Sequence, residues 1–377
     1  MKLQFRRKGL SEVYDEDCLT VVLEKNDDTL EGMLDFNNEN YECDFGRYID
    51  GTLGTYTVGE GKTMALEVSE SNPWIRLVRS DENRNSYIIQ AGWKPNDPEA
   101  DGREQSAKLI ITDRNGNKQE YTIKRRNFGL PVVYVAGNWW CKYNLKGTAN
   151  DFNDQILASA DPVKEGSLLD YLKDCSLEEL KAVMGDQYQG GNLEGLPLTL
   201  SDGKFEYSGF KSSVSVNINT QGKEMAPPGY EIPSQNDFRR LVNSNDAKLG
   251  YDPAVYNNNL NGDDSFRLNY NHGNRSVSID DVAYGKVGFY DFCEEASASD
   301  NSKHVVLFGW GHQWEAGTGK ISSDDFIFAV NNGTSTAWMM EGWFVDMRGN
   351  WFKTVTQNNV KSRTIRCKKS PVEYIYQ

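Results

Sequence analysis

The sequence predicts a multidomain chain, in which an N-terminal all-β sandwich of immunoglobulin-like type is followed by a mixed α+β domain. Two observations lead to this fold class. Residues up to about 127 combine alternating apolar and polar positions with hairpin signals, whereas the rest of the chain carries short capped helices between Gly- and Asn-rich loops. A length of 377 residues fits two or three domains, and an aromatic content of 12% provides for sizeable cores.

The N-terminal strands are predicted from alternation and turn chemistry. Residues 63–68 (TMALEV) alternate apolar and polar side chains, as do residues 107–111 and 121–123 on either side of Asn115-Gly116. An Asn-Gly pair supplies the positive φ angles that tight hairpins need. We therefore predict an antiparallel sandwich in this half of the chain.

A short stretch is predicted to link the two halves. Residues 127–134 (NFGLPVVY) contain Gly129 and Pro131, which interrupt regular structure. We accordingly place the sandwich at residues 1–127 and the second domain at residues 133–377.

Three helix starts follow the linker. Ser167 and Ser176 each precede an acidic residue by three positions, which is capping-box spacing, and Gly185 ends the second helix. The stretch APPGYEIPSQNDFRRLVN begins a third, with Ser234 three residues before Asp237. Its prolines and glycine end the preceding segment, so this stretch predicts a loop followed by a buried amphipathic helix.

Charge and hydropathy exclude some classes of partner. Lys and Arg total 41 against 55 Asp and Glu, a net charge of -14, which argues against nucleic acid and anionic membranes. No stretch is long and apolar enough for a transmembrane helix. The start, MKLQFRRKGLSEVYDED, has basic residues but lacks the apolar core of a signal peptide, so the protein is cytoplasmic or its leader has been removed.

The cysteines and histidines give no metal or catalytic motif. None of the six cysteines forms a C-x-x-C pair; they are Cys18, Cys43, Cys141, Cys175, Cys293 and Cys367. His304 and His312 have poor zinc-ligand spacing and lack neighbouring carboxylates in the sequence, so we expect polar loop and strand-end histidines. No G-x-S-x-G motif is present.

The first half resembles the BACON domains, small β-sandwich modules of secreted proteins from gut Bacteroidetes. The resemblance covers roughly residues 51–127. It rests on Trp74 after Ser-Asn-Pro, Arg103 followed by the SAKLIIT strand, Gly116 in the turn and the closing EYTIKRR. The usual terminal Gln is absent. Residues 1–50 add strands to this module or form a separate β unit.

Three separated pieces of the second half form one ordered pattern. They are NWWCKYNLKG, APPGYEIPSQNDFRRLV and SRTIRCKKS, and the residues that carry the pattern are Trp140, Asn144, Leu145, Pro227, Gly229, Tyr230, Ile232, Pro233, Ser234, Thr364, Ile365, Arg366 and Cys367. This set resembles the Fibrobacter succinogenes major paralogous domain over about residues 133–369. The resemblance implies a C-type-lectin-like fold, related to the scaffold of formylglycine-generating enzymes.

One departure from that family affects the cysteines. Ala226 stands where the family has a Cys, so the family's disulfide to Cys367 cannot form. Cys367 then pairs with Cys293 or stays a buried thiol, and the sequence leaves both open. The signature that flanks the reactive cysteines of the related enzymes is not visible, so we predict no catalytic residue.

Tryptophans beside glycine are the ligand-binding candidates, because such side chains stack on sugar rings or anchor protein partners. We name Trp310, Trp314, Trp343 and Trp351 as this site. Most of them are expected in the core, as lectin-like folds bury several tryptophans, and alternation in AWMMEGWFVDM favours Trp343 for the exposed face.

We predict no metal and no cofactor. Asn257, Asn259, Asn261 and Gly262 occupy positions 1, 3, 5 and 6 of an EF-hand pattern, but Leu268 replaces the bidentate Glu at position 12. The Glu-Pro-Asn, Gln-Pro-Asp and Trp-Asn-Asp triplets of calcium lectins are missing. Calcium is possible through Asp263 and Asp264 in an irregular oxygen site, but it lacks support, and a solvated Asn-rich turn is the expected structure.

These observations favour a non-enzymatic binding protein of a Bacteroidetes-type cell surface, secreted or surface-attached, that presents a lectin-like loop surface to a glycan or a host protein. Two alternatives remain: a structural subunit, such as a pilus tip or a phage-type receptor-binding protein, and an enzyme related to the formylglycine-generating enzymes. Fold resemblance alone does not assign a function.

Overall fold

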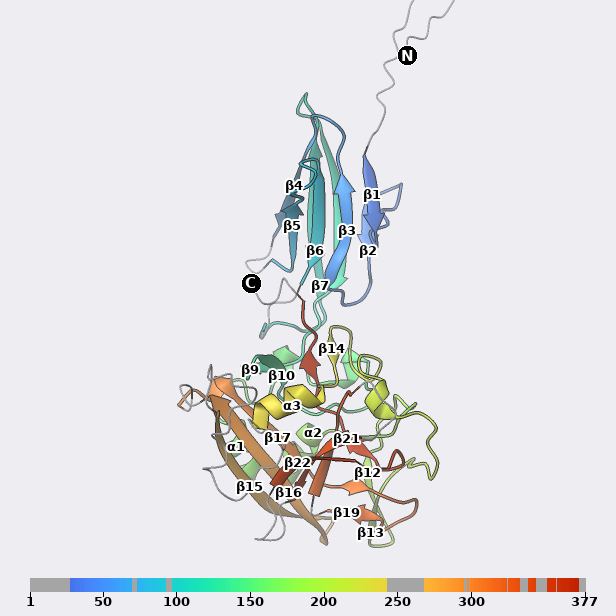
Figure 1. The fold of residues 1–377 in the computed structure, drawn as a ribbon, viewed down its shortest axis with the longest axis vertical. Coiled ribbons are helices and arrows are strands. Elements are labelled where there is room, and N and C mark those ends of the chain that lie inside the picture. The colour runs from blue at the N-terminus through green and yellow to red at the C-terminus, as the bar shows by residue number, and fades with distance from the viewer. Residues whose placement is uncertain are drawn as a thin grey trace, which may run out of the picture. The chain divides into compact units, whose positions relative to one another are not determined.

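The computed structural model describes residues 28–69, 73–92, 97–242, 268–294, 297, 299–323, 325–332, 338–343, 351–356 and 358–372. It is mostly β-sheet with short helices, which agrees with the β-rich, mixed composition predicted from the sequence. Contacts divide the chain into two compact units (Figure 1). The first unit is Met1–Asp44, Thr52–Ala91 and Ser106–Ile123, and the second is Phe45–Gly51, Gly92–Gln105 and Lys124–Gln377. These units divide the chain differently from the predicted ranges 1–127 and 133–377.

The first unit is built around two four-stranded sheets, ordered β1-β3-β6-β5 and β2-β8-β7-β4. Their strands are β1 (Thr29–Gly32), β2 (Glu42–Asp44), β3 (Gly51–Thr57), β4 (Thr63–Val68), β5 (Ile75–Arg79), β6 (Ser86–Ala91), β7 (Glu104–Thr112) and β8 (Lys118–Arg126). Alternating side chains are buried, as β7 shows most clearly. The strand predicted at residues 63–68 and the predicted hairpin partners are confirmed.

The turn between β7 and β8 differs in detail from the prediction. Gly116 has a φ of 84°, but Asn115 is not among the residues with positive φ. The Asp113 carboxylate accepts hydrogen bonds from the backbone N–H groups of Asn115 and Asn117, both at 2.8 Å. An aspartate-organised loop with one positive-φ glycine therefore closes this hairpin, because a carboxylate can replace backbone turn bonds.

The second unit contains five sheets, within the described residues. They are ordered β14-β24-β10-β9, β11-β23-β20-β21-β22, β15-β16-β17, β12-β13 and β18-β19. Their strands are β9 (Val132–Val135), β10 (Asn138–Cys141), β11 (Gln187–Tyr188), β12 (Leu198–Ser201), β13 (Lys204–Tyr207), β14 (Tyr230–Glu231), β15 (Leu268–Ile279), β16 (Val282–Glu294), β17 (His304–Gly309), β18 (His312–Gln313), β19 (Ile321–Ser322), β20 (Asp325–Ala329), β21 (Trp338–Trp343), β22 (Trp351–Thr356), β23 (Arg363–Thr364) and β24 (Lys368–Lys369).

All three predicted helices form in this unit. They are α1 (Leu168–Asp174), α2 (Leu177–Met184) and α3 (Gln235–Val242), and short 3-10 turns occur at η2 (Phe152–Asp154), η3 (Ala158–Ala160), η4 (Ile218–Thr220) and η8 (Asn301–Lys303). Ser167 and Ser176 cap the first two helices through their side chains, and Gly185 follows α2 with a φ of 74°. Ser234 and Asp237 exchange the two hydrogen bonds of a capping box at the start of α3.

The glycine in the Pro-Pro-Gly turn before α3 is needed for two reasons. Gly229 has a φ of 83°, a conformation that L side chains rarely adopt. A Cβ at this position would also lie 2.7 Å from the Tyr48 ring and would collide with the Lys369 ammonium group. The turn thus brings the backbone close to a buried lysine, which explains why the chain places a glycine there.

The predicted linker is wrong in its second half. Residues Val132–Val135 form strand β9 rather than a connection, and Leu130, Val132 and Val133 are at most 4% exposed. The Leu130 N–H donates to the Tyr230 hydroxyl at 2.8 Å. Apolar side chains lose more contact with water when they are packed in the core than in an exposed connection, and this outweighs the turn signals of Gly129 and Pro131.

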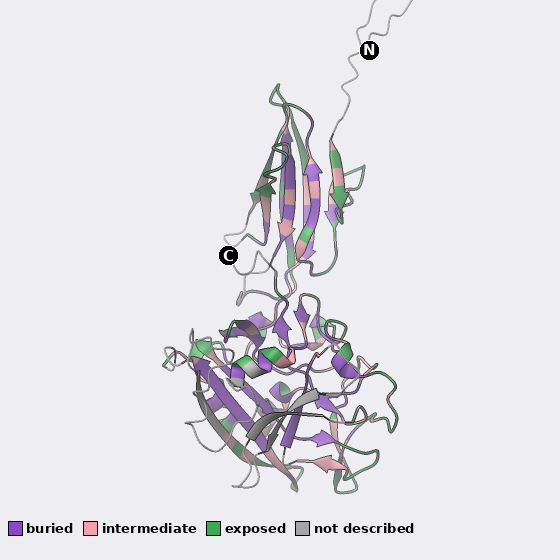
Figure 2. Cartoon of the chain, in the orientation of Figure 1, coloured by how far each residue is buried: buried purple, intermediate pink, exposed green. Residues whose placement is uncertain are grey.

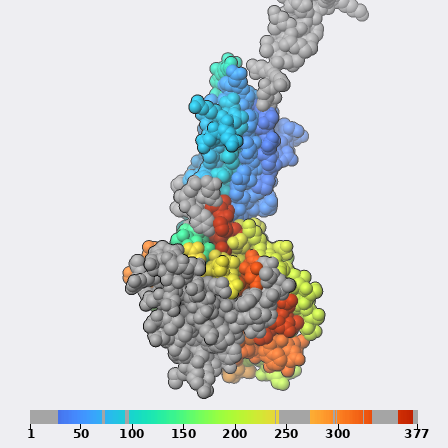
Figure 3. All heavy atoms as spheres, viewed as in Figure 1, coloured from blue at the N-terminus to red at the C-terminus, as the bar shows by residue number. Residues whose placement is uncertain are grey.

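Three buried clusters form the core of the second unit. In one, Phe238 of α3 packs against Trp140 with ring centroids 5.3 Å apart. Strands β16 and β17 are buried over most of their length (Figure 2). Distant segments also meet at the surface: the Gly319 N–H donates to the Phe205 carbonyl at 2.8 Å, and yellow-green and orange residues adjoin in Figure 3.

Candidate functional site

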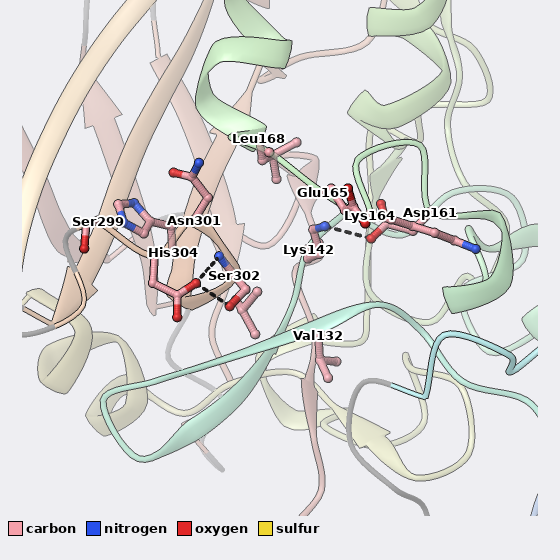
Figure 4. Close-up of a pocket in the computed structure, with 13 residues that line it drawn as sticks. Val132, Lys142, Asp161, Lys164, Glu165, Leu168, Ser299, Asn301, Ser302 and His304 are labelled. Atoms are coloured by element: carbon pink, nitrogen blue, oxygen red, sulfur yellow. Dashed lines mark hydrogen bonds and ion pairs between the residues drawn. The ribbon is translucent and has the colours of Figure 1, made fainter.

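A cavity of about 370 Å³ opens in the second unit, between two stretches that are far apart in the sequence. One side is formed by Lys142 and residues 161–168, and the other by residues 299–304 (Figure 4). Val132, Val133 and Leu168 supply apolar lining. The volume lies in the range of small-ligand sites, roughly 300–1,000 Å³.

The first wall is fixed by a buried ion pair. The Lys142 ammonium donates to Asp161 Oδ2 at 2.7 Å and to the Val163 carbonyl at 2.5 Å. The Tyr143 hydroxyl donates to the other carboxylate oxygen of Asp161 at 2.6 Å, and burial raises the pKa of that hydroxyl. Each of these groups is satisfied within the protein, so the wall is preorganised.

The second wall is a capped turn that leads into strand β17. Asp300 precedes the η8 turn, and its carboxylate accepts hydrogen bonds from the Ser302 N–H at 3.1 Å and the Ser302 hydroxyl at 2.6 Å. The turn ends at His304, the first residue of β17. This local capping sets the position from which the His304 ring lines the cavity.

His304 is held from behind by strand β16. Its Nδ1 lies 3.0 and 3.1 Å from the two carboxylate oxygens of Asp291, and Cys293 is its direct partner across the two strands. Asp291 and Cys293 are two positions apart, so both face the imidazole. Hydrogen bonding to Asp291, supplemented by Cys293, raises the pKa of His304 to about 10. The ring is therefore a cation at neutral pH.

Four polar side chains at the cavity have no hydrogen-bond or ion-pair partner among the described residues. Lys164, Glu165, Ser299 and Asn301 line it, and their side chains form no hydrogen bond or ion pair with the part of the chain that the structure describes. They provide an ammonium, a carboxylate, a hydroxyl and an amide on the two facing walls. Such groups are available to a ligand, whereas Lys142, Asp161 and Asp300 are already occupied.

The structure describes the side chains of two of the four predicted tryptophans. Trp310 is only 6% exposed and packs against Tyr284, as expected for most of these tryptophans. Burial in an apolar cluster with strands β15–β17 satisfies this large side chain better than a surface position. Trp314 is 44% exposed, with the Lys320 ammonium 4.8 Å from its ring centre. The side chains of Trp343 and Trp351 lie outside the described residues.

Sequence reasoning missed the carboxylate partners of both histidines. His304 and His312 do stand at strand starts, as expected, but each contacts an aspartate from another strand. The His312 Nδ1 lies 2.9 Å from Asp325, and both side chains are buried. The sequence does indicate that Asp291 and Cys293 share one face of a strand, because they are two positions apart. It does not indicate that His304 pairs with this strand, since that pairing joins separate segments of the chain.

The described residues include five of the six cysteines, all of them buried and free. Cys367 is a buried free thiol, one of the two states that the sequence left open, and Cys293 is also free. Among the described residues, no group of three His, Cys, Asp or Glu side chains could hold a metal ion. The EF-hand-like positions Asn257–Gly262 lie outside those residues.

The motif residues of the second half meet in the core. The Arg366 guanidinium donates from Nε and Nη2 to Asn144 Oδ1 at 3.0 and 2.8 Å. The Leu145 N–H donates to the Ile365 carbonyl at 3.0 Å, and Tyr230 pairs with Lys369 across β14 and β24. These residues build the scaffold rather than the cavity.

No family model, curated protein or solved structure matches this chain. Within the described residues, no helix combines the length and the apolar character required to cross a membrane.

Proposed function

We propose that the protein is a non-enzymatic, extracellular or cell-surface binding protein whose second unit binds a glycan in the cavity between residues 161–168 and 299–304. The observation that carries this proposal is the contrast within the cavity wall. Some of the lining groups are held by hydrogen bonds within the protein. Four other polar side chains of the lining make no hydrogen bond or ion pair with the described residues; they are Lys164, Glu165, Ser299 and Asn301.

The state of the nearby reactive groups supports binding over catalysis. A general base must be unprotonated near the working pH, but His304 has a pKa of about 10 and is protonated there. The Cys293 thiol is 4% exposed and does not line the cavity. The groups that face the cavity therefore favour recognition by hydrogen bonding.

The lining suits the chemistry of a sugar. Hydroxyl groups of a sugar ring donate and accept hydrogen bonds, and the cavity offers both donors and acceptors through ammonium, amide, hydroxyl and carboxylate groups. Val132, Val133 and Leu168 provide an apolar surface for the C–H face of a ring. Cations and carboxylates are both present, so a neutral or zwitterionic glycan fits better than a polyanion.

The test is binding to an array of host and plant glycans. The wild type is compared with Lys164→Ala and Asn301→Ala at the cavity, with Trp314→Ala at the exposed tryptophan, and with Lys223→Ala as a matched exposed lysine away from the cavity. We expect a specific glycan signal that falls about tenfold in each cavity variant and is unchanged in Lys223→Ala.

A signal lost only in Trp314→Ala would move the site away from the cavity. Silence of the folded wild type across the array would overturn the glycan proposal and favour a protein partner.

A further inference from the structure

Two of the buried thiols face each other where β10 meets the start of β24. Trp140 of β10 pairs with Lys368 of β24, so the antiparallel register places Cys141 opposite Cys367. The Cys141 N–H donates to the Cys367 carbonyl at 2.9 Å, which confirms this alignment. Residues that face each other in an antiparallel pair project their side chains to the same side of the sheet.

The core around the two thiols agrees with this geometry. Cys141 and Cys367 belong to one buried cluster, whereas their neighbour Trp140 belongs to another. Both cysteines are at most 1% exposed, and neither is bonded to another cysteine. Ala226 lies in the same cluster, and because it is not a cysteine it cannot compete for a disulfide with Cys367.

The Cα separation expected for such partners suits a disulfide. Hydrogen-bonded antiparallel partners have Cα atoms about 5.5 Å apart, and disulfides are found with Cα atoms roughly 4.4–6.8 Å apart. We propose that Cys141 and Cys367 form a cross-strand disulfide when the chain folds in the presence of a disulfide oxidant. The bond would tie β10 to the C-terminal segment, closing a loop that contains most of the second unit.

The chemistry is thiol–disulfide exchange with a glutathione-type or protein disulfide. The thiolate of one cysteine attacks the oxidant and releases one thiol; the second cysteine then attacks the mixed disulfide and releases the other thiol. Two cysteine protons end on the two thiols of the reduced oxidant. Burial raises the pKa of both thiols in the folded chain, so exchange takes place while the strands assemble, before the core closes.

The experiment is oxidative refolding of the full chain. Protein reduced and unfolded in guanidinium and dithiothreitol is refolded with reduced and oxidised glutathione, or with dithiothreitol alone as the control. Free thiols are then alkylated in denaturant, and linked peptides are mapped by mass spectrometry without reduction. We expect the peptides of Cys141 and Cys367 to be linked after oxidative refolding, two fewer alkylated cysteines, and a Tm several degrees above that of the reduced protein.

Two variants complete the test. Cys141→Ala removes the linked peptide and the oxidant-dependent rise in Tm, while Cys43→Ala leaves both unchanged. All six cysteines alkylated after oxidative refolding, or a link from Cys367 to Cys293 or Cys18, would overturn the proposal. Mapping of the wild type decides the question even if Cys141→Ala folds poorly.

Discussion

The cavity and the C-terminal segment use the same kinds of side chain for opposite purposes. Residues 362–370 carry four cationic residues, Arg363, Arg366, Lys368 and Lys369, and every residue in this segment is buried. At the cavity, Lys164 and Glu165 are exposed and have no partner among the described residues. A buried charge that is held by hydrogen bonds or ion pairs is part of the architecture, whereas an exposed charge without a partner at a cavity is available to a ligand.

Arg366 makes several such hydrogen bonds. Besides its two bonds to Asn144, its Nη1 donates to the carbonyls of Val306 at 2.8 Å and Cys141 at 3.2 Å. The guanidinium carbon lies 4.6 Å from the centre of the Phe308 ring. Neutral oxygens and an aromatic face surround this cation, and burial lowers its pKa to about 9.

The largest effect is expected from Arg366→Met. The change leaves the Asn144 amide oxygen and two carbonyls buried without their donor, so we expect a loss of about 3–5 kcal/mol in the free energy of unfolding, measured by urea denaturation. An Asn144→Ala and Arg366→Met double-mutant cycle should show a coupling of about 1–3 kcal/mol. A loss below about 1 kcal/mol in Arg366→Met would contradict an architectural role.

Lys369→Met comes next, because it breaks a buried ion pair. The Lys369 ammonium donates to the Tyr48 hydroxyl at 2.6 Å and to Asp50 at 2.9 Å. We expect a loss of about 2–3 kcal/mol at pH 7, since Asp50 loses its charged partner.

The pH dependence of this variant identifies the cause. Burial lowers the pKa of Lys369 to about 8, whereas an unfolded lysine titrates near about 10.4. Between these values the unfolded chain binds the extra proton, so the stability of the wild type relative to Lys369→Met should rise with pH. Denaturation curves of both proteins from pH 7 to 10 measure this difference in stability. A difference that stays constant or falls with pH would show that burial does not lower the pKa of Lys369.

His304→Gln should give a smaller loss with the opposite pH dependence. The pKa of His304 is raised to about 10, so its contribution is complete below the unfolded value near about 6.5 and is lost as pH rises toward 10. We expect about 1–3 kcal/mol at pH 6 that shrinks steadily at higher pH. The same denaturation series provides the measurement, with Asp291→Asn as the matched variant; equal losses at pH 6 and pH 10 would rule out the charged pair.

Local signals were read correctly from the sequence, and long-range pairings were not. Capping at Ser176 and Ser234 depends on neighbours within three residues, and the structure confirms both helices. Asp291 meets His304 only because β16 pairs with β17, and their register depends on the whole sheet. Burial of Trp310 likewise depends on elements that lie far away in the sequence. The cavity is lined by residues that are far apart in the sequence, so no local motif predicts it.

The smallest effect on stability should come from Lys164→Ala. This exposed side chain forms no bond with the described part of the chain, so the free energy of unfolding should change by less than about 0.5 kcal/mol. Affinity for the glycan found on the array should nevertheless fall about tenfold, which corresponds to about 1.4 kcal/mol. Calorimetric titration and urea denaturation of the same preparation separate the two quantities, with Lys223→Ala as the control. Unchanged affinity in Lys164→Ala would exclude this side chain from ligand binding, and a large loss of stability would place it with the architectural cations instead.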